Sequence, residues 1–348
     1  EFEKVTSNQS ILFDQASDNR FTDNKFYDCG STDKGQIILL YDKSDRNRLD
    51  HNLMKGNVSF GMVIKLPKDN DNSFEYSHDN RFDHNEFRDI KKGGLFSRIP
   101  LQIGQWASYH TKDETRSMID HNEFINVETT GVNSKSNNET YLYNRFINNS
   151  VGVSLSLRGG NNKVVEGNYF ENIKTALQIY GVNHKIINNI IVNSTEIGII
   201  IPRYGAFSST ARSEPTGDML LAHNTIVNAR QKAIEVGRIW GSLKADNMPF
   251  NVRIIDNILS AKVGVLLENR GTIDEEVRSN LYYATDTATV GQIGIESTIG
   301  DPRFTTDYAL TKNSPAVDRA TLLTEVSQDF GKVARGFIPD VGAREYVQ

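Results

Sequence analysis

The sequence predicts an all-β protein folded as a right-handed parallel β-helix with an irregular C-terminal cap. Three observations support this prediction. A short motif with an asparagine at its centre recurs ten times along the chain. The shortest intervals between these asparagines are 21 to 24 residues, which suits one coil of a solenoid built from short strands. Apolar and polar residues alternate around the motif with the two-residue period of β-strands.

The repeat reads approximately apolar-x-apolar-x-x-Asn-x-apolar-x-Asn/Asp, as in "IDHNEFINV" at 119–127 and "LLAHNTIVN" at 220–228. Aligned on the central asparagine, its instances are Asn24, Asn52, Asn85, Asn122, Asn144, Asn168, Asn189, Asn224, Asn257 and Asn280. Asparagine tolerates the left-handed backbone angles of a sharp corner, and its amide can hydrogen-bond to the same residue of the next coil. We therefore expect an asparagine ladder along one corner, with inserted loops in the longer intervals.

Other repeat architectures fit less well. The asparagine and glycine content is high for helical repeats, and no 3.6-residue apolar stripe is present. A β-sandwich or propeller stays an alternative, although propeller blades need about 40 residues. The repeat fades after residue 284, and the turn-rich remainder reads as a cap that hides the edge of the solenoid. We expect a single domain over 1–348, with coils at about 10–300 and the cap at about 301–348.

The composition restricts the class of protein. The chain has 348 residues and a net charge of -5, which disfavours nucleic acid as a partner. No apolar run reaches the roughly 18 residues that a membrane-spanning helix needs. The single cysteine, Cys29, excludes an intrachain disulfide and is expected to be a buried thiol. The chain starts at Glu1 without an initiator methionine, so we expect a processed or excised protein, in which a removed secretion signal would not be visible. The expected location is secreted or periplasmic, with the signal not present in this chain.

Two cations and a tyrosine recur at similar offsets in successive repeats. Lys135, Arg158 and Tyr180 precede the central asparagines of three consecutive repeats by nine, ten and nine residues. Equivalent positions in neighbouring coils lie about 4.8 Å apart, so these side chains should form a column on one face. A lysine stacked on an arginine is repulsive, which points to an anionic ligand. The alternative is a pair of solvated surface cations without a function.

Further candidates for ligand binding are cationic, aromatic or polar residues near this column or in the long inserts 85–122 and 189–224. Such inserts commonly wall a cleft on a rigid scaffold. Taken singly, each residue is more often ordinary surface or core. The candidates are Arg98, Trp106, His110, His184, Arg203 and Tyr204. Further cations that could line the same region are Lys91, Lys92, Arg145, Lys163 and Lys185.

The segment 127–170 carries motifs that together resemble polysaccharide lyase family 6, which holds alginate lyases and chondroitinase B. In order, "VETTGVNSKS", "NRF", "LRGGN" and "VEGNYF" are similar to the family's Glu-x-Glu…Lys-Ser, Asn-x-Phe, Leu-Arg-His-Gly-Asn and Val-Glu-Gly-Asn-Phe-Phe. Upstream, "LQIG" with Gln102 resembles Ile-Arg-Ile-Gly, and downstream "GVNHKIINN" resembles Gly-x-x-His-x-Val-x-Asn-Asn. The similarity covers about 100–195 and the C-terminal segment.

The resemblance implies an enzyme that cleaves a uronate polymer by β-elimination. By correspondence, Lys135 would remove the C5 proton, and Arg158 would act as the acid or bind the carboxylate. A neighbouring arginine and partial desolvation both lower the pKa of a lysine, as a base requires. Arg158 stays charged and is better suited to holding an anion. Glu128, Gln102 and Tyr180 are then expected among the substrate-binding residues.

The chain departs from the family pattern at the calcium ligands. Family members commonly hold calcium with one asparagine and two glutamates, and only Glu128 matches. Thr130 stands at the second glutamate, and Phe96 stands where we place the asparagine. Calcium prefers about six to eight oxygen ligands. We therefore predict no cofactor and no catalytic metal, with Arg98 as the first candidate to neutralise the substrate carboxylate.

Two glycines follow Arg158 where the family has a histidine and a glycine. Gly159 replaces that histidine, so the function of the ring is lost or has moved to His184 or His110. Gly159 and Gly160 could leave room for a sugar ring against the backbone, or they could simply form a turn.

These observations predict a polysaccharide lyase that acts on an acidic polysaccharide. We expect alginate, because most of the resembled family acts on it. A non-catalytic carbohydrate-binding β-helix and a uronate C5-epimerase are the alternatives. A hydrolase is disfavoured because no acidic pair occupies matching offsets beside Lys135.

Overall fold

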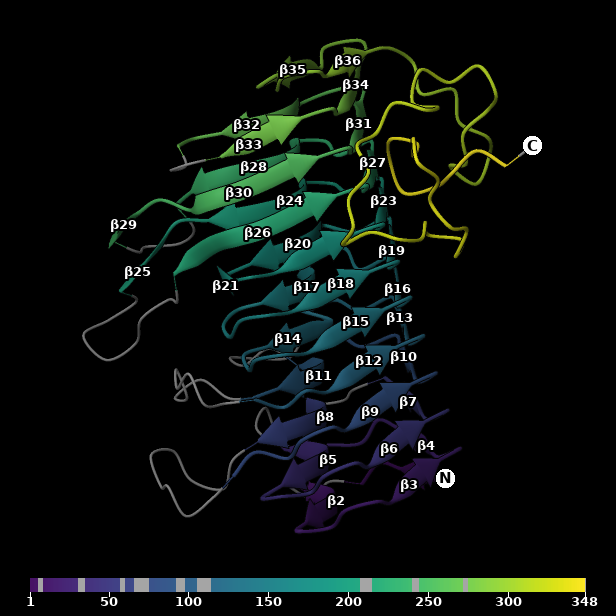
Figure 1. The fold of residues 1–348 in the computed structure, drawn as a ribbon. Helices are drawn as coiled ribbons and strands as arrows, with labels where there is room; N and C mark the ends of the chain where they lie inside the picture. Colours follow the sequence, from purple (N-terminus) through teal and green to yellow (C-terminus); the bar gives the residue numbers. More distant parts are fainter. Residues whose placement is uncertain are drawn as a thin grey trace.

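The computed structural model describes residues 1–5, 9–30, 35–56, 60–65, 75–91, 98–104, 114–206, 215–239, 244–271 and 275–347. These residues form short strands joined by turns and bends. No helix among them is long and apolar enough to cross a membrane. The strands stack in successive coils from the N-terminal end upward (Figure 1).

The strands belong to three long sheets, named A, B and C here. Sheet A runs β1 (Phe2–Glu3), β4 (Lys25–Tyr27), β7 (Leu53–Lys55), β10 (Glu86–Arg88), β13 (Glu123–Ile125), β16 (Arg145–Ile147), β19 (Tyr169–Glu171), β23 (Ile190–Val192), β27 (Thr225–Val227), β31 (Ile258–Ala261), β34 (Leu281–Ala284) and β36 (Thr298–Ile299). Sheet B runs β2 (Gln9–Asp14), β5 (Gln36–Tyr41), β8 (Phe60–Lys65), β11 (Ile99–Ile103), β14 (Val132–Ser134), β17 (Val153–Leu157), β20 (Thr175–Ile179), β24 (Ile197–Pro202), β28 (Lys232–Arg238), β32 (Val265–Asn269) and β35 (Thr289–Gly291).

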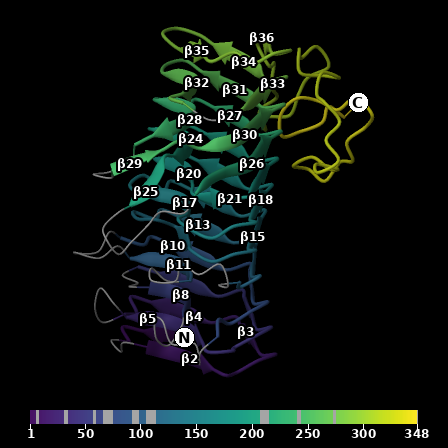
Figure 2. The ribbon, with the colours of Figure 1, turned by 60° about the vertical axis from the view of Figure 1, so that its left-hand side comes forward.

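Sheet C runs β3 (Arg20–Thr22), β6 (Arg48–Asp50), β9 (Arg81–Asp83), β12 (Met118–Asp120), β15 (Thr140–Leu142), β18 (Val164–Glu166), β22 (Lys185–Ile187), β26 (Thr216–Ala222), β30 (Phe250–Ile255) and β33 (Glu276–Arg278), with β21 (Gly181–Val182) also beside β26. A separate antiparallel pair joins β25 (Tyr204–Ala206) and β29 (Lys244–Asn247). In the three long sheets each strand pairs in parallel with the equivalent strand of the next coil, as the turned view shows (Figure 2). The fold is the predicted right-handed parallel β-helix.

The predicted asparagine ladder is present at all ten positions. In each rung the backbone N–H and the side-chain amide donate to the Oδ1 of the next asparagine, as Asn144 does to Asn168 and Asn168 does to Asn189. One detail of the prediction is wrong. The left-handed backbone angle falls on the residue before each asparagine, for example Gly167 (φ 66°) and Asn188 (φ 55°). The asparagine itself points inward, because its amide satisfies the backbone groups of the corner.

Replacing Asn168 by alanine is expected to lower the free energy of unfolding by about 3 kcal/mol, because several buried hydrogen-bonding groups lose their partner. Asn168 is fully buried, and its amide also donates to the carbonyl of Tyr141. Urea unfolding measures the change. Asn172→Gly is the control, since it removes an exposed amide at a residue with φ of 52°. Equal losses from the two variants would contradict a structural role for the ladder.

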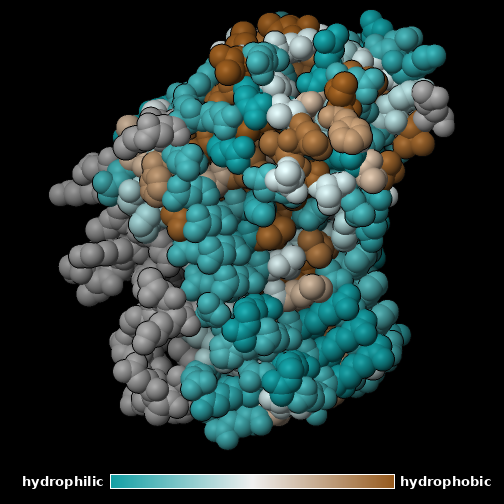
Figure 3. Space-filling view, viewed as in Figure 1, coloured by the Kyte–Doolittle hydropathy of each residue, from teal (hydrophilic) through white to brown (hydrophobic). Residues whose placement is uncertain are grey.

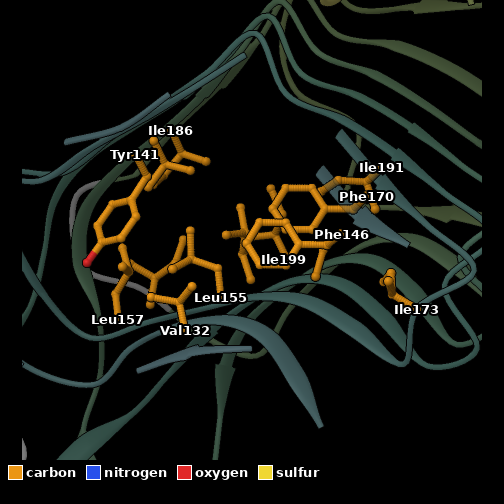
Figure 4. Packing of buried hydrophobic residues seen from close by; sticks show 14 of the residues in the cluster. Val132, Tyr141, Phe146, Leu155, Leu157, Phe170, Ile173, Ile186, Ile191 and Ile199 are labelled. Atoms are coloured by element: carbon orange, nitrogen blue, oxygen red, sulfur yellow. The ribbon is translucent and has the colours of Figure 1, made fainter. Parts of the chain in front are cut away.

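The interior is filled by stacked side chains at equivalent positions of successive coils. The rings of Phe87, Phe124, Phe146 and Phe170 stack with centroid separations of 4.8, 4.6 and 4.8 Å. Aliphatic residues from sheet B pack beside the rings (Figure 4). Cys29 is a buried free thiol, as predicted. This rigid core fixes the register of the outward-facing residues.

The segment from residue 301 onward is irregular and lies along the side of the upper coils (Figures 1 and 2). It packs on outward-facing apolar residues of sheets A and C, such as Ile190, Ile258 and Leu220. Hydrophobic residues gather at this upper part of the molecule, whereas the lower coils are mostly hydrophilic in the same view (Figure 3). The segment therefore covers a flank of the solenoid.

Candidate active site

The three residues of the predicted column follow consecutive strands of sheet B. Lys135 follows β14, Arg158 follows β17 and Tyr180 follows β20. Their backbone N–H groups donate to the carbonyls of Ile103, Ser134 and Leu157 respectively, each at 2.8 Å in the coil below. The three residues therefore occupy equivalent positions in successive coils, as the sequence offsets predicted. It lies at the corner where sheet B ends.

Lys135 is nearly buried, with 8% of its surface exposed. Burial, and secondarily the positive charge of Arg158, lower the pKa of Lys135 to about 7. A large fraction of this lysine is thus uncharged near neutral pH, so its amine can accept a proton. Arg158, half-buried in the next coil, keeps a fixed positive charge beside it.

A pocket of about 250 Å³ opens on the outer face of sheet B next to this column. Arg158 and Tyr180 lie at one end, and Thr130 and Lys174 lie at the other. Its remaining lining residues are Val151, Gly152, Val153, Ser156, Thr175 and Gln178. The pocket therefore spans the width of sheet B, with Arg158 toward one end and Lys174 toward the other.

Ser156 and Gln178 are pocket residues that the sequence analysis missed. They are in register with each other and with Gln102 and Asn133, and the hydroxyl of Ser156 donates to Gln178 Oε1 at 2.9 Å. Each lies two residues before a member of the column. Because side chains in a strand alternate between faces, this offset could have identified them.

Gln102 lies in this polar row, and its amide donates to the carbonyl of Gly104 at 3.0 Å. Arg98 and Glu128 lie at the opposite end of sheet B from Lys135, before β11 and β14. Glu128 Oε1 contacts Lys91 Nζ at 2.8 Å. Strand β14 therefore separates Glu128 from Lys135.

Arg203 and Tyr204 continue the same edge after β24. The guanidinium of Arg203 donates to the carbonyls of Gly237 and Arg270 in the coils above. These contacts hold Arg203 against the backbone beyond Tyr180. Trp106 and His110, also predicted at the site, lie outside the described residues, as does Phe96.

His184, which the sequence analysis placed among the substrate-binding residues, is buried behind the column. The ring is 1% exposed, Nδ1 accepts the backbone N–H of Lys163 at 3.1 Å, and Nε2 bonds to the carbonyl of Tyr180 at 2.9 Å. Burial, and then the charge of Lys163, lower the pKa of His184 to about 3. The ring is therefore neutral, with both nitrogens engaged by the backbone behind the column.

Gly160 is required by a close approach between coils. It has φ of 76°, and a Cβ at this position would lie 1.8 Å from the carbonyl oxygen of Ser136. Of the two interpretations of the glycine pair, the tight turn accounts for Gly160.

The sequence matches the family model described as chondroitinase B over residues 2–259. The chain belongs to the chondroitinase B family. This confirms the resemblance to polysaccharide lyase family 6 that the motifs predicted. No curated protein matches the sequence.

Several solved structures of other proteins have the same fold as this chain. A variant of the family 6 alginate lyase AlyGC is 17% identical with a TM-score of 0.64, covering 99% of this chain and 56% of that one. A mannuronic-acid-specific family 6 lyase from human gut microbiota is 15% identical with a TM-score of 0.53, covering 80% of each chain. A variant of the periplasmic alginate epimerase AlgG is 12% identical with a TM-score of 0.52, covering 80% of this chain and 74% of that one. The chain thus spans little more than half the length of AlyGC.

Proposed function

We propose that this protein is a polysaccharide lyase that cleaves a uronate polymer, with alginate as the expected substrate. The observation that carries the proposal is that Lys135, nearly buried and with a pKa of about 7, lies one coil from Arg158, which lines a pocket. Family membership supports the same reaction class. A polymer of this kind also fits the secreted or periplasmic location expected from the sequence.

Lys135 and Arg158 have different roles in the proposed reaction. Lys135, uncharged, takes the C5 proton, and the electron pair left on C5 forms the C4=C5 double bond as the C4–O4 bond breaks. Arg158 remains charged, so it stabilises the substrate carboxylate and the negative charge that develops during proton removal. It also assists protonation of O4, for which the ammonium formed on Lys135 is a neighbouring proton source. Tyr180, Gln178 and Ser156 line the adjoining pocket and would contact the sugar rings.

A lyase assay on a panel of uronate polymers tests this proposal. Elimination creates a conjugated double bond, so alginate should give products that absorb in the ultraviolet, in a time-dependent manner. Glycosaminoglycans serve as the comparison polymers, since the family model carries the name of a chondroitinase. Absence of such products from every polymer would contradict the proposal.

The residues present do not fit the calcium ion that the resemblance implies. Glu128 contacts a lysine, and Thr130 offers a neutral side-chain hydroxyl where the family has a carboxylate, so one carboxylate remains of the implied ligand set. We therefore derive no step through calcium. Three cations at this end of sheet B are the candidates to bind substrate carboxylates. Lys91 and Arg98 lie at the end of the sheet that carries Glu128, and Lys174 lines the pocket there.

Activity is expected to survive chelation, because protein cations take the place of the metal. The rate on alginate should change by less than about two-fold in excess EDTA. Magnesium-saturated EDTA is the control for effects of the chelator on the polymer. Loss of activity in EDTA with recovery on adding calcium would show that the substitutions at Thr130 and Phe96 do not remove the metal site.

A further inference from the structure

A buried ion pair lies behind the column of Lys135, Arg158 and Tyr180. Glu139 and Lys163 have no exposed surface, and Lys163 Nζ lies 3.4 Å from Glu139 Oε2. Burying two charges costs desolvation free energy that their attraction often does not recover. Packing alone is therefore a poor explanation for this pair.

Lys163 contacts residues adjacent to Lys135 and Arg158, and it is linked to Tyr180 through His184. Its Nζ donates to Ser134 Oγ at 2.5 Å, directly before Lys135, and to the carbonyl of Gly159, directly after Arg158. Its backbone N–H donates to His184, whose other ring nitrogen bonds to the carbonyl of Tyr180.

Glu139 contacts residues of three coils through its two carboxylate oxygens. Its Oε1 accepts from the hydroxyl of Thr115 at 3.2 Å, and its Oε2 lies 3.4 Å from Ser134 Oγ. Burial raises the pKa of Glu139, and the charge of Lys163 opposes that rise. Three coils are thus tied together at one buried point.

We infer that Glu139, Lys163 and His184 form a positioning network that holds Lys135, Arg158 and Tyr180 in the arrangement needed for proton removal. The inference rests on the proposed lyase function. His184 bonds to the carbonyl of Tyr180. Lys163 and Glu139 contact Ser134, and Lys163 also contacts Gly159, so both hold residues that adjoin the column. None of the three is among the residues that line the pocket. Their effect is to fix the spacing between the lysine amine and the guanidinium, on which both the orientation and the basicity of the lysine depend.

The double variant Lys163→Met/Glu139→Gln tests the inference, because it removes both charges and leaves neither buried without a partner. We expect kcat to fall about 100-fold with KM within about three-fold, the loss typical of a misplaced catalytic group. Ser134→Ala, a smaller change, should lower kcat about ten-fold in the same way. It keeps the test available if the double variant does not fold.

The titration of Lys135 gives a readout that needs no catalysis. Competitive acetylation across a pH series, followed by mass spectrometry of the peptide, measures its pKa. We expect a rise from about 7 in both variants, since a relaxed column exposes the amine. Arg335→Met/Glu345→Gln removes a paired arginine and glutamate from the C-terminal segment and should leave kcat and this pKa unchanged.

Wild-type kcat together with an unshifted Lys135 pKa in the folded variants would overturn the inference. If the wild-type protein cleaves no uronate polymer, the proposed function fails. The acetylation result then still decides whether the network positions Lys135.

Discussion

Replacing Lys135 by methionine is expected to lower kcat/KM on alginate by about 1,000-fold or more, because the reaction loses its base. Methionine fills a similar volume and suits a site that is only 8% exposed, so the fold should be retained. Initial rates from ultraviolet absorbance measure the loss, and the melting temperature checks the fold.

Lys185→Met is the matched control for this variant. Lys185 is an exposed lysine at the start of β22 on sheet C, away from the pocket on sheet B. Its replacement should leave the rate within about two-fold, as is usual for a surface substitution. A Lys135→Met variant that turns over alginate at the wild-type rate would exclude Lys135 as the base.

Replacing Arg158 by methionine is expected to lower kcat/KM by about 100- to 1,000-fold and to move the pH profile. The rate loss follows from losing the cation that stabilises the developing charge. The shift follows from Lys135: its positive neighbour favours the neutral amine, so removing Arg158 raises the pKa of Lys135.

The sign of the pH dependence follows from the base. Lys135 acts when uncharged, so wild-type kcat/KM should rise with pH, level off above about pH 7 and fall about ten-fold per unit below it. In Arg158→Met this rise should move to higher pH, while Arg158→Lys should keep it closer to the wild-type position. A profile in which Arg158→Met rises at lower pH than the wild type would contradict the coupling.

Much of the fold could be predicted from the sequence, because an asparagine marks the same corner position in each of the ten repeats. Each ladder asparagine must satisfy the same buried backbone groups, so it recurs even where loop length varies. The column of Lys135, Arg158 and Tyr180 was accessible for the same reason, since equal offsets from the ladder place residues in register. The left-handed residue was missed because Gly167, Asn188 and their equivalents vary in type.

The support behind the site could not be read in this way. Lys163 was one of several cations near the motifs, and only the tertiary structure shows that it is buried against Glu139. His184 belongs to a motif of the resembled family, which suggested contact with a ligand. In the structure its ring nitrogens bond to backbone groups of Lys163 and Tyr180. The contact between Glu128 and Lys91 joins neighbouring coils through side chains whose direction the repeat does not define.

A proton NMR time course of alginate incubated with the wild-type protein tests the central claim most directly. β-Elimination by the site at Lys135 and Arg158 predicts new signals from the vinyl proton of an unsaturated terminal sugar, growing as the polymer shortens. An epimerase would change the ratio of the two uronates without shortening the chain, and a binding protein would leave the spectrum unchanged. Either of these results would contradict the proposed lyase.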